Sequence, residues 1–107
     1  MRVLIDECLN WRLGRALTGH YAVSAQRMGW SGIQNGRLLA LCVENGFDVF
    51  LTGDRNLAFQ QDMTEFSLVV VVLEAPGIQL RHTLPLMPKV LALLPSLKPG
   101  QVARVTA

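Results

Sequence analysis

The apolar run from Leu68 to Leu73 constrains the fold of this chain more than any other feature. Four consecutive valines stand between two leucines, and β-branched residues favour strands. A strand with one face in water alternates polar and apolar residues, so an unbroken run predicts a strand covered on both faces, as in a parallel sheet under helices. The run has six residues and no apolar run in the chain is longer, whereas a membrane span needs about 20.

The rest of the chain divides into short periodic segments that end at glycine or proline. The patterns predict strands at residues 3–5, 21–25 and 49–52, helices at about 9–18 and 35–45, and a short helix or helical turn at 57–63. Thr83 is expected to cap a last helix that runs to about Leu94, with Pro85 in its first turn. Residues 101–106 form either an edge strand or a loose tail.

Strands that alternate with helices predict an α/β fold, here a three-layer α/β/α sandwich with a mainly parallel sheet of four or five strands. A chain of 107 residues supports one domain over residues 1–107, and a charged fraction of 17% excludes disorder as the main state. Asp6 and Glu7 interrupt the first apolar stretch, so no signal peptide is expected. Cys8 and Cys42 lack metal-site spacing and indicate free thiols in the cytoplasm, with Cys42 in the core.

Acidic residues follow two of the predicted strands. Asp6 and Glu7 come directly after the first strand, and Asp54 comes just after the third. Ligands of parallel sheets bind beyond the carboxyl ends of the strands, and paired carboxylates are ligands that Mg²⁺ or Mn²⁺ accepts. If these strands are neighbours, Asp6 and Asp54 face each other across a metal site. The alternative is that either aspartate caps the helix that follows it.

Other residues near these acids have candidate roles. Thr52 can ligate the metal or support a ligand, and Arg55 and Asn56 can contact a substrate phosphate or orient a water molecule. Glu74 ends the fourth strand and can reach the same crevice. The other acids are read as surface or turn residues: Glu44, Asp48, Asp62 and Glu65.

Three segments together resemble the short bacterial PIN-like proteins. They are Val-Leu-Ile-Asp-Glu at 3–7, the helix start Gly32-x-x-Asn35, and Val-Phe-Leu-Thr-Gly-Asp-Arg-Asn at 49–56. The resemblance covers about residues 1–75 in order. It implies a metal-dependent nuclease fold, and many members of that family are VapC-type toxins that cleave RNA and are paired with small antitoxins.

Carried onto this chain, the resemblance implies that Asp6 and Asp54 hold the metal, with Glu7 beside them. Asn35 and Asn56 stand where the family tends to have aspartate, and Arg37 can place a cation where a second metal would lie. A two-metal site is therefore not expected, and one weakly bound Mg²⁺ or Mn²⁺ is. The expected function is a toxin-like endoribonuclease, and the alternative is a catalytically degenerate domain that binds protein or RNA.

A second, weaker resemblance is to two-component receiver domains. These also have an acid pair after the first strand and an aspartate after the third, and Lys98-Pro99 is similar to their late lysine. However, Glu74-Ala75-Pro76 ends the fourth strand where receivers have serine or threonine.

The remaining features concern partners. Trp11 can stack on a base or anchor the rim of the core, and Trp30 lies in a glycine-containing loop that can meet a partner. Residues 75–107 hold four basic and no acidic residues, which suits RNA backbone or a solvated tail. An apolar excess near the C-terminus packs on the sheet or forms a homodimer or antitoxin contact; it comprises Leu84, Leu86, Met87, Leu91, Leu94 and Leu97.

Overall fold

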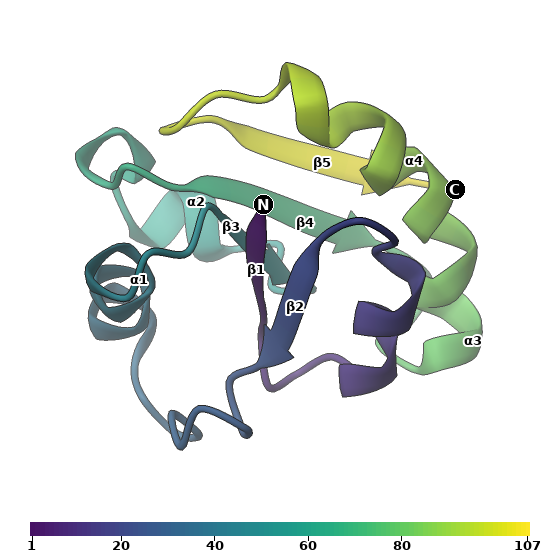
Figure 1. The fold of residues 1–107 in the computed structure, drawn as a ribbon, viewed down its shortest axis with the longest axis horizontal. Helices are drawn as coiled ribbons and strands as arrows, with labels where there is room; N and C mark the ends of the chain where they lie inside the picture. The colour runs from purple at the N-terminus through teal and green to yellow at the C-terminus, as the bar shows by residue number, and fades with distance from the viewer.

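A five-stranded parallel sheet forms the middle of the molecule. The computed structural model describes residues 1–107, and its strands are β1 (Arg2–Ile5), β2 (Tyr21–Ser24), β3 (Val49–Thr52), β4 (Val69–Glu74) and β5 (Val102–Thr106). Their order across the sheet is β2-β1-β3-β4-β5, and every neighbouring pair is parallel (Figure 1). The predicted strands are confirmed. Residues 101–106, for which the sequence left an edge strand or a loose tail open, contain the edge strand β5.

Helical segments cover both faces of the sheet. They are the 3-10 helices η1 (Trp11–Ala16), η2 (Met63–Glu65), η3 (Leu84–Leu86) and η4 (Leu94–Ser96), and the α-helices α1 (Asn35–Glu44), α2 (Leu57–Gln60), α3 (Leu80–Thr83) and α4 (Met87–Leu93). None of these helices has the length and apolar character needed to cross a bilayer.

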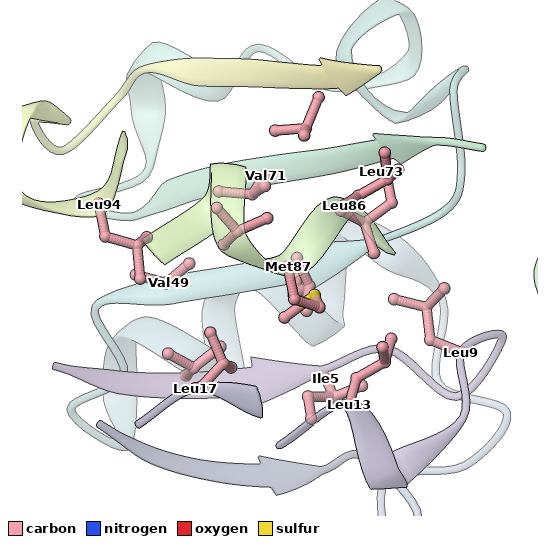
Figure 2. Packing of buried hydrophobic residues seen from close by; sticks show 14 of the residues in the cluster. Ile5, Leu9, Leu13, Leu17, Val49, Val71, Leu73, Leu86, Met87 and Leu94 are labelled. Carbon is pink, nitrogen blue, oxygen red and sulfur yellow. The ribbon is translucent and has the colours of Figure 1, made fainter. Parts of the chain in front are cut away.

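Two separate hydrophobic clusters show that the sheet is covered on both sides. Because successive strand residues point to opposite faces, Ile5 and Leu51 join the first cluster, where they pack with η1, η3 and α4 (Figure 2). Leu4 and Phe50 join the second cluster, with residues of α1 and α2. The predicted three-layer α/β/α sandwich is therefore confirmed, and the β4 valines are fully enclosed as their unbroken run required.

The first helix differs from its prediction. It is a short 3-10 helix over Trp11–Ala16 and not a helix over 9–18, and Asn10 caps it by accepting a hydrogen bond from the Arg12 N–H at 2.9 Å. Gly14 lies in its middle, where a Cβ atom would come within 3.3 Å of Ala22 Cβ. The glycine lets the helix approach the sheet closely, and its low helix propensity favours a short helix.

The C-terminal helix is also divided more finely than predicted. It begins at Leu80, ahead of Thr83. Thr83 stands in the cap position of η3, but its side chain makes no capping hydrogen bond, because the hydroxyl donates to the Gln79 carbonyl at 3.3 Å. Prolines then occupy the first turns of η3, α4 and η4. Since proline lacks an N–H and blocks the preceding turn, each one starts a new helical segment.

Two expectations about apolar surface are settled by packing. Trp30 is partly buried: it packs against the second cluster and meets the Phe47 ring edge-on at 6.0 Å between centroids. Of the C-terminal apolar residues, Leu86, Met87 and Leu94 are buried in the first cluster, while Leu84 is exposed. Most of these C-terminal apolar side chains therefore pack against the sheet.

Candidate functional site

The two predicted metal acids lie at the carboxyl ends of neighbouring strands. β1 pairs directly with β3, with Ile5 opposite Leu51, so Asp6 and Asp54 follow the two strands at one edge of the sheet (Figure 1). After β1 the chain continues to β2, which lies on one side of β1 in the sheet. The next strand, β3, lies on the opposite side of β1, so the strand order reverses there. In a sheet of this order, that reversal is where ligands bind.

Asp6 is nearly buried and has one oxygen held by the protein. Its residue surface is 7% exposed, and Oδ2 accepts hydrogen bonds from Thr52 Oγ1 at 2.7 Å and from Cys8 Sγ at 3.5 Å. No protein donor is bonded to Oδ1. Because no fully buried side-chain oxygen or nitrogen lacks a partner, this second oxygen is at least partly exposed to solvent.

Thr52 joins the two aspartates. The side chain is fully buried at the end of β3, and its hydroxyl donates to Asp6 while accepting a hydrogen bond from the Asp54 backbone N–H at 3.0 Å. With its proton committed to Asp6, the hydroxyl fixes the positions of both acids. Its two predicted roles, as a metal ligand or as a support for one, stay predictions.

Both carboxylate oxygens of Asp54 accept hydrogen bonds from the protein. Its Oδ1 accepts from the Asn56 backbone N–H at 2.9 Å, in the turn that leads to α2. Its Oδ2 accepts from Asn35 Nδ2 at 3.3 Å, at the first residue of α1. The capping interpretation is wrong for both aspartates, because the cap residue of η1 is Asn10 and that of α2 is Asn56.

Glu7 does not join the two aspartates. Its Oε1 accepts a hydrogen bond from the Gly32 N–H at 2.9 Å, and its carbonyl accepts one from Gln26 Nε2 at 3.2 Å. Glu7 therefore holds the loop that follows β2. No group of three or more histidine, cysteine, aspartate or glutamate side chains converges as a metal site, so the expected set of three carboxylates is not brought together.

The predicted cationic and accessory residues are engaged elsewhere. Arg55 donates to the Ala75 carbonyl at 2.7 Å, and Arg37 pairs with Glu44 at 3.4 Å on the exposed surface of α1. Glu74 pairs with Arg104 of β5 at 3.0 Å, so its carboxylate is engaged on the β5 side of the sheet. The two aspartates are not neutralised by any of these arginines.

Cys8 is the residue at this site that sequence reasoning did not place there. A turn closed by the Leu9 N–H and the Asp6 carbonyl at 3.0 Å brings its thiol back to the Asp6 carboxylate. Burial, and then the Asp6 charge, raise the pKa of the Cys8 thiol. The same two causes, in the same order, raise the pKa of buried Cys42 to about 12. Both thiols are therefore protonated and poor nucleophiles at neutral pH.

A polar hollow lies next to Asn35, the residue that donates to Asp54. It has a volume of about 470 Å³ and lies between the start of α1 and the end of α2, and Asn35 connects it to Asp54. Carboxamides dominate its lining, which comprises Ile33, Gln34, Asn35, Gly36, Arg37, Gln60 and Gln61. Such groups hydrogen-bond neutral polar ligands in both directions.

The topology separates Lys98 from the aspartates. Lys98 precedes β5, and nearby Gly100 donates to the carbonyl of Leu68, just before β4. Because all the strands are parallel, Lys98 lies at the amino edge of the sheet, opposite Asp6 and Asp54. The receiver-like arrangement of a lysine beside the acids is therefore absent.

Comparison with protein-family models, with curated proteins and with solved structures finds no match to this chain.

Proposed function

We propose that this chain is a PIN-like, toxin-like endoribonuclease of the cytoplasm that uses one Mg²⁺ or Mn²⁺ ion. The single observation that carries the proposal is the convergence of Asp6 and Asp54 beyond β1 and β3, where Thr52 links them. This is the position at which a sheet of this order binds its ligand.

The residues fit one hard cation. Asp6 Oδ1 is free of protein hydrogen bonds and at least partly exposed to solvent, and the Asp54 carboxylate is held by Asn35 and the Asn56 N–H. Asp6 and Asp54 would hold the ion. When bound, it would lower the pKa of a water molecule and neutralise charge on the scissile phosphate. Two carboxylates with amide neighbours predict weak binding, since amide oxygens carry no charge.

The neighbouring hollow supplies a place for the RNA. Its carboxamides suit the donor and acceptor edges of a nucleobase, and Asn35 connects it to Asp54. Thr52 would keep both acids in position while the substrate binds. In this proposal the natural partner is a small antitoxin protein.

A cleavage assay tests the proposal. The purified protein is incubated with mixed RNA and Mn²⁺, beside the variant Asp6→Asn/Asp54→Asn and the control Asp48→Asn. Asp48 is exposed at the opposite edge of the sheet, where its carboxylate accepts from the Arg2 N–H. We expect cleavage by the native protein and by the control, and loss of cleavage in the double variant and in EDTA. Equal cleavage by all three proteins would overturn the assignment.

A second function is favoured by one specific observation, the absence of a third acid at the site. In this alternative the domain has lost catalysis and binds RNA or a protein. Titration calorimetry with Mn²⁺ separates the two functions. The enzyme must bind Mn²⁺ at millimolar concentration, and this binding must depend on Asp6. Absence of binding at that concentration supports the alternative.

A further inference from the structure

The strand β2 leaves one side of the sheet open. It is the outermost strand, opposite β5 (Figure 1). The Tyr21 N–H donates to the Met1 carbonyl at 3.0 Å and the Ala25 N–H to the Ile5 carbonyl at 2.8 Å, so alternate residues of β2 face β1. In a parallel ladder the residues between them face outward. Ala22 therefore presents its N–H and carbonyl to the outside, and Ser24 presents its N–H.

A groove follows this open edge. It has a volume of about 610 Å³ and is lined by the residues of β2 together with Trp11, Gln26 and Arg27. Trp11 of η1 and Tyr21 are about half exposed, at 49% and 52%. The other outer strand is partly closed by comparison, because Lys89 donates to the Thr106 carbonyl of β5 at 2.8 Å. The β2 edge is thus the one shaped to receive an extended chain.

Arginines gather beside this groove. Arg12 and Arg15 lie over the ring of Trp11 at 4.7 and 5.0 Å, and Arg2 lies over the ring of Tyr21 at 4.8 Å. Of the nearby arginines, only Arg27 lines the groove itself. None of these arginines forms an ion pair, since the two ion pairs of the molecule involve Arg37 and Arg104. Stacking on an aromatic face orders a guanidinium while leaving its N–H groups free.

The outward backbone groups of β2 and the arginines beside the groove together indicate which kind of molecule binds there. A second copy of this chain would bring its own Arg12, Arg15 and Arg27 to the same edge, and like charges would repel. An RNA strand would stack its bases on exposed aromatic rings, but guanidinium groups already lie over the Trp11 ring. An extended peptide uses the outward N–H and carbonyl groups directly, and acidic side chains complement the arginines.

We propose that the β2 edge binds an acidic, extended segment of a partner protein as an additional strand. The backbone groups of Ala22 and Ser24 pair with the incoming strand, and Arg12, Arg15 and Arg27 pair with its carboxylates. The segment requires acidic residues that alternate along it, because successive side chains of a strand point to opposite faces. This inference does not depend on the proposed nuclease activity.

Fluorescence anisotropy with labelled peptides tests it on the intact chain. The probe is a peptide of about six residues, the usual length of a strand, in which glutamate and threonine alternate. We expect it to bind more weakly as salt rises, and we expect a lysine–threonine peptide of equal length not to bind. The variant Arg12→Glu/Arg15→Glu should weaken binding at least about tenfold, because each substitution replaces an attraction to the acidic peptide with a repulsion.

Two further measurements separate strand pairing from charge attraction alone. Ala22→Pro removes an outward N–H at a position where an edge strand tolerates proline, and it should weaken binding about tenfold with unchanged charge. A glutamate–threonine peptide with N-methylated backbone should bind no better than the lysine peptide. Equal binding of the methylated and unmethylated peptides overturns the proposal, even if Ala22→Pro fails to fold. Tighter binding of a single-stranded RNA oligonucleotide, insensitive to Ala22→Pro, overturns it in favour of nucleic acid.

Discussion

Replacement of Thr52 by valine tests the link between the two aspartates. The threonine hydroxyl is fully buried. It makes two hydrogen bonds to the aspartates, donating to Asp6 at 2.7 Å and accepting from the Asp54 N–H at 3.0 Å, and it lies 4.0 Å from Cys8 Sγ. Valine has nearly the same shape and makes neither. The change therefore removes the connection between the acids and leaves the packing around β3 almost as it was.

The expected cost follows from the partners that lose their bonds. A hydrogen bond to a charged group contributes about 1.5–3 kcal/mol and one between neutral groups about 1 kcal/mol. The added methyl group returns about 0.8 kcal/mol of apolar burial. We expect Thr52→Val to lower the free energy of unfolding by about 2–3 kcal/mol, a large share of the 5–15 kcal/mol that holds a typical domain folded.

Urea unfolding followed by circular dichroism measures this loss, and Thr83→Val is the matched control. Thr83 is equally buried, but its hydroxyl donates only to carbonyls of its own helical segment, at 3.3 and 3.5 Å. The lost neutral hydrogen bond, about 1 kcal/mol, is offset by about 0.8 kcal/mol from the added methyl group. The replacement should therefore change the free energy of unfolding by about 0.5 kcal/mol or less. A Thr52→Val loss no larger than that of the control would refute the view that Thr52 supports both acids.

Three smaller predictions concern other parts of the fold. Burial raises the pKa of Cys42 from 9.0 to about 12. The thiol therefore ionises first in the unfolded chain, and the free energy of unfolding should fall as pH rises from 9 toward 12. Urea unfolding should show a smaller fall between pH 8 and pH 10 in Cys42→Ala than in the native protein. Gly46 follows α1 with a φ of +77°, so Gly46→Ala should cost about 1 kcal/mol by the same measurement, and Gly46→Asn less. Glu74→Gln breaks a partly exposed pair with Arg104 and should cost under about 1 kcal/mol, a difference that shrinks in high salt.

Much of the fold could be predicted because it depends on local patterns. The β4 run has no polar face, so only a strand covered on both sides satisfies it. Gly19 and Gly46 both adopt positive φ after helical segments, as their positions in the sequence indicate. The divided C-terminal helix was harder to predict, because a proline can either open one helix or separate two.

The candidate site was predictable only in part. The spacing of Asp6 and Asp54 after two strands indicated one crevice, and the pairing of β1 with β3 confirms that those strands are neighbours. The partner of each side chain depends on loops that no local pattern describes. Glu7 is next to Asp6 in sequence but bonds to Gly32, and Cys8, two residues after Asp6, turns back to contact its carboxylate.

The sequence by itself determined the layered α/β architecture and the positions of the acids along the chain. Both follow from the period of apolar residues and from where each run stops, which are properties of neighbouring residues. Only the tertiary structure decided that β5 completes the sheet, that Arg55 and Glu74 bond away from the aspartates, and that β2 keeps an open, basic edge. These three features depend on which distant segments of the chain come into contact. Those contacts form because the whole sheet is buried between its two helical layers.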